Sequence, residues 1–166
     1  MLDRRWTLAL RTALAVYLAA VLCLTMWPSL EQTAVPSWAE AVVRAAATVG
    51  LTLTVAFLEA ASNLVMFVPF GVLVLLLWWG ARRRSARAGG AGAGAWRLVL
   101  PVTGVACAFS AAIELAQLGI PARVSTVQDL VLNTAGGLLG AAVTAAVVTA
   151  VGRRPAAPSA ADRVQD

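Results

Sequence analysis

Four long apolar segments constrain the fold of this chain more than any other feature of its sequence. They cover approximately residues 7–27, 63–80, 97–118 and 128–151. Each approaches the roughly 20 residues that a helix needs to cross the hydrocarbon core of a bilayer. Only 13% of the residues are charged, against about 25% in a typical soluble domain. The sequence therefore predicts an all-α integral membrane protein, a compact bundle of four transmembrane helices.

The arginines lie mostly in alternate connections between these segments. Arg4 and Arg5 precede the first segment, Arg153 and Arg154 follow the fourth, and the connection between the second and third holds Arg82, Arg83, Arg84, Arg87 and Arg97. The other two connections hold only Arg44 and Arg123. Because positive residues favour the cytoplasmic side of a membrane, both termini are predicted to be cytoplasmic.

The composition also bears on the source and the partners of the chain. It contains no lysine and much Ala and Gly, as is typical of a GC-rich bacterial genome, so we expect a multi-pass protein of the bacterial cytoplasmic (inner) membrane. The net charge of +5 is explained by topology and by attraction to anionic lipids. The lipid bilayer is therefore an expected partner. Nucleic acid is not an expected partner, because the sequence has no nucleic-acid-binding motif.

A single transmembrane domain is expected over residues 1–152, followed by a disordered cytoplasmic tail at 153–166. Residues 81–95 are rich in Arg, Ala and Gly and are predicted to form a flexible cytoplasmic loop. The apolar stretch at about 41–60 is interrupted by Arg44 and Gly50 and leaves no room for a turn before the second span. We interpret it as an interfacial or re-entrant segment on the outer face.

Polar side chains gather where the spans meet the outer surface. Glu114 and Gln117 end the third span, Asp129 and Asn133 open the fourth, and Arg123 lies in the loop between them. Ionisable groups are costly inside a membrane and mark functional sites by default. We therefore predict an outward-facing cluster that binds a ligand, made of Asn63, Glu114, Gln117, Arg123, Asp129 and Asn133.

A second group of residues is predicted to set the packing of the helices. Pro69 removes one backbone hydrogen bond from the second span, where Gly71 follows it closely. Gly136 and Gly140 form a G-x-x-x-G pattern with Gly137 beside them, which lets a neighbouring helix approach closely. We expect the polar face of the third span to pack on this small-residue face, with the two spans antiparallel. Cys23 and Cys107 fall inside spans as small apolar residues, so neither a metal site nor a cofactor is predicted.

These motifs resemble those of the VanZ-like family of small bacterial membrane proteins. The resemblance covers about residues 59–145 and rests on E114-x-x-Q117, R123, D129-x-x-x-N133-T134-x-G136-x-x-x-G140 and N63-x-x-x-F67-x-P69-x-G71. It implies a compact helical membrane domain with a role in the cell envelope, and the founding member is associated with resistance to teicoplanin. The chain departs from the family pattern after Arg123, where Val124-Ser125-Thr126 replaces the usual hydroxyl or acid.

Three classes of function remain open from the sequence. The polar cluster could bind an amphiphile such as a lipid-linked wall precursor, a phospholipid headgroup or a lipoglycopeptide, with Arg123 pairing an anionic group. It could instead only lock the packing of the helices, so that the function is assembly with a partner membrane protein. The two carboxylates could also act as general acid and base or share a divalent cation, but the chain has no His, and an enzyme is the least favoured of the three.

Overall fold

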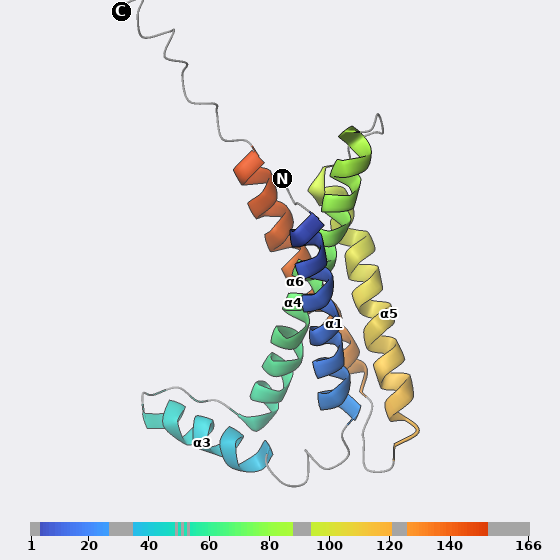
Figure 1. Ribbon diagram of the computed structural model, residues 1–166. Helices are drawn as coiled ribbons and strands as arrows, with labels where there is room; N and C mark the ends of the chain where they lie inside the picture. The colour runs from blue at the N-terminus through green and yellow to red at the C-terminus, as the bar shows by residue number, and fades with distance from the viewer. Residues whose placement is uncertain are drawn as a thin grey trace, which may run out of the picture.

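The computed structural model describes residues 4–26, 35–48, 50, 52, 54–87, 94–120 and 126–152. Within these ranges every regular element is a helix (Figure 1). The elements are α1 (Arg4–Met26), α3 (Val35–Thr48), α4 (Val55–Arg87), the 3₁₀ helix η1 (Ala95–Leu98), α5 (Val99–Gln117) and α6 (Val127–Gly152). The predicted disordered tail at 153–166 lies outside the described residues.

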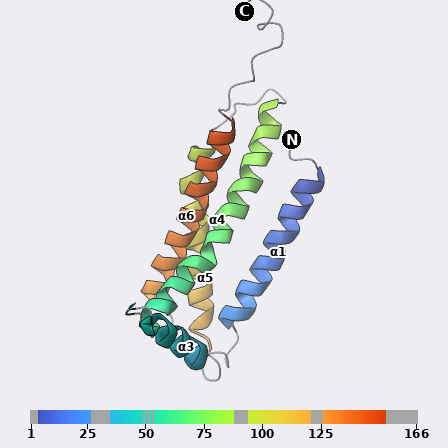
Figure 2. The ribbon, with the colours of Figure 1, turned by 90° about the vertical axis from the view of Figure 1, so that its left-hand side faces the viewer.

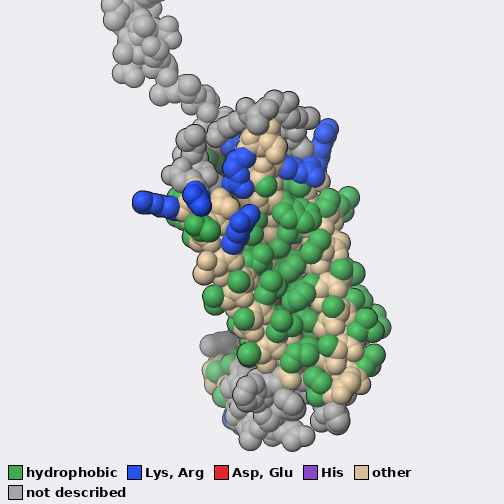
Figure 3. Space-filling model, turned by 45° about the vertical axis from the view of Figure 1, so that its right-hand side comes forward, with side chains coloured by type: hydrophobic (Ala, Val, Ile, Leu, Met, Phe, Trp, Pro, Cys, Tyr) green, Lys and Arg blue, Asp and Glu red, His purple; other side chains and the backbone are tan. Residues whose placement is uncertain are grey.

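Four of the described helices are long and apolar enough to cross a membrane, which confirms the four predicted spans. They cover Arg4–Met26, Ala56–Ala86, Ala95–Gln117 and Val127–Gly152. Their outward-facing side chains are apolar as well: Val65 is 63% exposed, Leu100 79% and Leu115 69%. Figure 3 shows this apolar surface along the flank of the bundle, with most of the visible Arg side chains at one end. Such a surface is suited to contact with lipid and not with water.

The helices run alternately up and down, so that α4 and α6 point the same way and α1 and α5 point the other way (Figure 1). The start of α1 and the end of α6 lie at one end, together with Arg82–Arg84, and we call it the arginine-rich end. The opposite end holds Asn63, Gln117 and Asp129, and we call it the polar end. Figure 2 shows that α4, α5 and α6 form a group while α1 stands at its side.

The closest contact in the bundle joins α4 to α6 through glycines of both helices. A Cβ atom built on Gly136 would overlap the carbonyl oxygen of Leu64, and one on Gly140 would overlap that of Val68. In the reverse direction, a Cβ on Gly71 would overlap the carbonyl oxygen of Gly137. The two backbones therefore touch with no side chain between them, as small-residue faces allow in membranes. The sequence predicted that the third span packs on this glycine face, but of these glycines only Gly137 faces α5. A Cβ on Gly137 would come within 2.5 Å of Ala106 Cβ.

Helix α4 begins earlier than predicted, at Val55 and not at about 63. Thr54 caps it, since the Phe57 N–H donates to Thr54 Oγ1 at 3.1 Å, and this bond satisfies one of the free donors of the first turn. Residues 55–60 are therefore the first turns of a long helix, which corrects the interfacial or re-entrant interpretation for that part of 41–60. Helix α3 covers the earlier part, is followed by a turn at Gly50 with φ 80°, and projects to one side of the bundle at the polar end (Figure 1). Its position at a membrane surface stays a prediction.

Helix α4 also ends later than predicted, because residues 81–87 continue it and do not belong to a flexible loop. Ala and Arg favour helix strongly. The Arg83 guanidinium lies over the Trp79 ring, 4.0 Å from its centroid, and Arg84 Nη1 donates to Thr7 Oγ1 on α1 at 3.1 Å. The first contact stabilises the last turns of α4 within the helix, and the second joins them to α1. The helix also passes through Pro69 without interruption.

We predict that Gly140→Ala lowers the free energy of unfolding by about 1–3 kcal/mol, the usual cost of forcing a methyl group into a packed contact. Gly104→Ala is the matched control, because Gly104 is exposed on α5 and nothing lies within 4 Å of its added Cβ. The control should leave stability unchanged or raise it by up to about 1 kcal/mol. Equilibrium unfolding in mixed detergent micelles measures both variants, and equal effects of the two would contradict the glycine contact.

Candidate functional site

Five of the six residues predicted to form the polar cluster are described, and all five lie towards the polar end. They come from three helices: Asn63 from α4, Glu114 and Gln117 from α5, and Asp129 and Asn133 from α6. Arg123, the sixth, lies outside the described residues. Glu114, Gln117 and Asn133 are buried, whereas Asn63 and Asp129 are partly exposed. The five residues form four sets of contacts, three within the polar end and one that reaches α1.

The first set joins α4 to α6. Asn63 Nδ2 donates a hydrogen bond to Asp129 Oδ1. The two residues are 66 positions apart in the sequence and meet because the glycine contact brings the helices together one to two turns further along.

The second set caps helix α6 from the neighbouring helix α5. The Asp129 N–H donates to Thr126 Oγ1 at 3.1 Å, which identifies Thr126 as the N-cap residue. In a capping box the acid three residues on would accept the cap residue's own N–H. Here Glu114 of α5 does so, since its Oε2 accepts from the Thr126 N–H at 3.1 Å. Glu114 therefore takes the place of Asp129 in the cap, and Asp129 can reach across to Asn63.

The third set lies deeper and includes one polar atom without a partner. Asn133 Nδ2 donates to Ser110 Oγ at 2.9 Å, and both residues are buried. Asn133 Oδ1 is also buried, yet it accepts no hydrogen bond within the described part of the chain. An unpaired buried acceptor of this kind costs roughly 1–3 kcal/mol. Asn133 lies one helical turn below Asp129, so this acceptor sits beneath the partly exposed Asn63–Asp129 pair.

Gln117 connects the cluster to α1, where its Nε2 donates to the backbone oxygen of Thr25 at 3.0 Å. Thr25 could not be predicted from the sequence, because a backbone acceptor leaves no signal there. Thr126 was missed too, although the pattern Thr-x-x-Asp before an apolar run is a recognisable helix start. Ser110 belongs to the polar face of the third span that the sequence predicts to pack against the fourth, although it was not included in the predicted ligand-binding cluster.

The arrangement is suited to hydrogen bonding. Among the described residues, no three His, Cys, Asp or Glu side chains come close enough together to hold a metal ion. Glu114 and Asp129 each bond to a different partner, a backbone N–H and a carboxamide. What the cluster offers a ligand is a set of acceptors at the polar end, from Asp129 and from Asn133 Oδ1.

Comparison with known proteins bears on the family of the chain. The model of the VanZ/LLP1 family matches residues 14–148, a range that begins within α1 and ends near the end of α6. The match confirms the resemblance found in residues 59–145 and extends it to the first span. No curated protein matches the chain, and no solved structure does.

We predict an interaction free energy of about 0.6 kcal/mol, and at most about 1.7, between Asn63 and Asp129 in a double-mutant cycle of Asn63→Ala and Asp129→Ala. The value is small because polar groups in membranes find other partners when one is removed. Ser62→Ala with Asp129→Ala is the control cycle and should be additive, since Ser62 Oγ donates to the Glu59 carbonyl of its own helix. Unfolding in mixed micelles gives the energies, and additivity of both cycles would exclude the Asn63–Asp129 bond.

Proposed function

The chain belongs to the VanZ/LLP1 family, and from that premise we propose that it binds an amphiphilic ligand of the cell envelope at its polar end. The ligand places its headgroup against Asn63 and Asp129 and its tail in the bilayer. The candidate classes are a lipid-linked wall precursor, a phospholipid and a lipoglycopeptide. Binding of this kind would contribute to envelope homeostasis or to resistance against glycopeptide antibiotics such as teicoplanin.

The observation that carries this proposal is the buried, unpartnered oxygen of Asn133 beneath a partly exposed polar pair. An acceptor held without a donor is stabilised when a ligand supplies one. Asp129 adds further acceptor capacity, because a carboxylate has about four lone-pair sites and Asn63 uses one of them. These groups select a headgroup rich in donors, such as sugar hydroxyls, amides or an ammonium. A pairing of Arg123 with an anionic group of the same ligand is a further part of the proposal.

The proposal requires the polar end to face the outside of the cytoplasmic membrane. The distribution of charge supports this orientation, since Arg4, Arg5 and Arg82–Arg84 lie at the opposite end (Figure 3). Positive residues at the ends of spans are retained on the cytoplasmic side. The polar end is then at headgroup depth in the outer leaflet, where an envelope amphiphile can reach it without crossing the membrane.

A second function is favoured by the hydrogen bonds that join the helices. Asn63 bonds α4 to α6, Glu114 bonds α5 to the start of α6, and Gln117 bonds α5 to α1. A cluster that connects all four spans at one end could serve only to fix the bundle. The protein would then act through a partner membrane protein that recognises the assembled bundle, and no ligand would enter the cluster.

Antibiotic susceptibility of a host that lacks the protein separates the two functions. We predict that wild type gives several-fold protection against a lipoglycopeptide or glycopeptide, and that Asp129→Asn loses it at equal membrane abundance and equal thermal stability. Asp129→Asn keeps the size of the side chain but removes the charge and half of its acceptor oxygens. Glu59→Gln is the matched control, because it neutralises an exposed acid one turn before Asn63 on α4 and should keep full protection.

Each outcome of this experiment decides between the proposals. Loss of protection in proportion to lost abundance or stability, in Asp129→Asn and in Glu114→Gln alike, supports the structural function and contradicts ligand binding. Full protection by Asp129→Asn also contradicts ligand binding at this site. Wild type that protects against none of the compounds contradicts the resistance role.

A further inference from the structure

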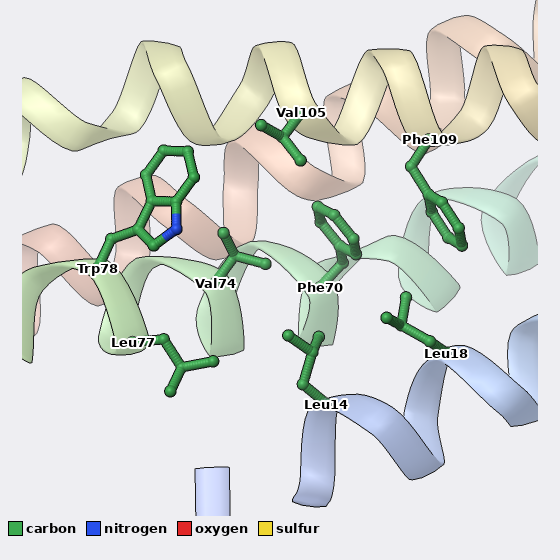
Figure 4. Close-up of a pocket in the computed structure, with 8 residues that line it drawn as sticks. All are labelled: Leu14, Leu18, Phe70, Val74, Leu77, Trp78, Val105 and Phe109. Atoms are coloured by element: carbon green, nitrogen blue, oxygen red, sulfur yellow. The ribbon is translucent and has the colours of Figure 1, made fainter. Parts of the chain in front are cut away.

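An apolar cavity of about 310 Å³ lies between α1, α4 and α5, away from the polar end. Its lining includes Leu14 and Leu18 of α1, Phe70 and Trp78 of α4, and Val105 and Phe109 of α5, as Figure 4 shows. Every lining side chain is hydrophobic, and all of them belong to membrane spans. Its volume is at the lower end of the range of about 300–1,000 Å³ that is typical of ligand sites.

The cavity exists because α1 is held to the bundle by a few separate hydrogen bonds and buries few of its side chains against it. Arg84 bonds to Thr7 near one end, Tyr17 Oη donates to the Met66 carbonyl at 2.7 Å, and Gln117 bonds to Thr25 at the other end. Of the described side chains of α1, only that of Val21 is buried. Leu14 and Leu18 line the cavity from α1, and the stacked rings of Phe70 and Phe109, whose centroids lie 5.5 Å apart, line it from α4 and α5 (Figure 4). A gap of this size inside a bilayer loses dispersion energy unless hydrocarbon fills it.

Positive charge flanks the cavity on the side of the arginine-rich end. Arg11 precedes Leu14 by three residues and Arg82 follows Trp78 by four, so each lies one helical turn beyond the lining. Both side chains are exposed, and the bond between Arg84 and Thr7 brings the same parts of α1 and α4 together. The acidic side chains that the structure describes, Glu59, Glu114 and Asp129, lie towards the polar end instead. This end of the cavity is therefore suited to an anion at the level of the membrane surface.

We propose that the cavity holds one acyl chain of an anionic phospholipid of the cytoplasmic leaflet, whose phosphate is bound by Arg11 and Arg82. The apolar lining accepts the chain, and the two guanidinium groups select the charge of the headgroup. The site is independent of the proposed polar-end function, because Trp78 lies fifteen residues, about 22 Å of helix, beyond Asn63. The lipid would fill the space beside α1 and so complete the packing of that helix.

Native mass spectrometry of the purified full chain in a mild detergent tests this site. The protein is titrated with phosphatidylglycerol and, in parallel, with phosphatidylcholine of the same acyl chains. We expect a single phosphatidylglycerol adduct at roughly tenfold lower lipid concentration than the phosphatidylcholine adduct, since two arginines attract the anionic headgroup. Val105→Trp, which fills the cavity, should weaken the adduct with either lipid about tenfold. Leu100→Trp is the control for added bulk, because Leu100 is 79% exposed on the same helix.

The charge is tested separately from the cavity. The double variant Arg11→Gln with Arg82→Gln should abolish the preference for phosphatidylglycerol but keep the adduct. Arg4→Gln with Arg5→Gln removes the same charge from the first turn of α1 and should keep the preference. Leu14→Phe fills the cavity from α1 and replaces Val105→Trp if that variant fails to fold. Equal affinity of wild type for the two lipids, or adducts unchanged by both filling variants, overturns the proposal.

Discussion

The direct contact between the backbones of α4 and α6 is the constraint on which the rest of this structure depends. Gly136 and Gly140 admit the carbonyl groups of Leu64 and Val68, and Gly71 admits that of Gly137. The hydrophobic effect does not drive helices together inside a bilayer, so the energy comes from close packing over this face. Because α4 and α6 are parallel, the contact also aligns their first turns. Asn63 thereby reaches Asp129, a residue that the sequence alone places at no particular distance from it.

The contacts at the polar end depend on this alignment, and they also fix the positions of α5 and α1. Glu114 caps α6 in place of the acid within α6 itself, which fixes how α5 meets the start of α6. Gln117 extends the connection to α1. The bundle is thus tight where α4, α5 and α6 meet and loose beside α1. The tight part carries the polar groups, and the loose part leaves the apolar cavity, so the two proposed sites arise from one uneven distribution of packing.

Hydropathy was sufficient to predict the four spans, and the spaced motifs carried the resemblance to the family, because apolar length and the spacing of a few polar residues are local properties. The predicted ends of α4 were wrong, because the helix extends beyond its apolar run at both ends. Thr54 caps its start, and the contact of Arg83 with Trp79 stabilises its last turns. The prediction that α5 packs on the glycine face holds for Gly137 but not for Gly136 and Gly140, which meet α4. A G-x-x-x-G pattern predicts a close approach but does not identify the helix that approaches. The pairings of Asn63, Glu114 and Gln117 depend on contacts between residues far apart in the chain, as does the cavity beside α1, and no local pattern encodes them.

The central claim is that the polar end faces outward while the arginine-rich end faces the cytoplasm, and site-specific labelling in intact cells tests it most directly. Single cysteines would replace Thr48 on α3 and Ser85 on α4, two exposed positions at opposite ends, after Cys23 and Cys107 are changed to Ala. A membrane-impermeant maleimide should label Thr48→Cys in intact cells and Ser85→Cys only after the membrane is permeabilised. The reverse pattern would place the polar cluster in the cytoplasm and contradict both the orientation and the envelope ligand proposed for it.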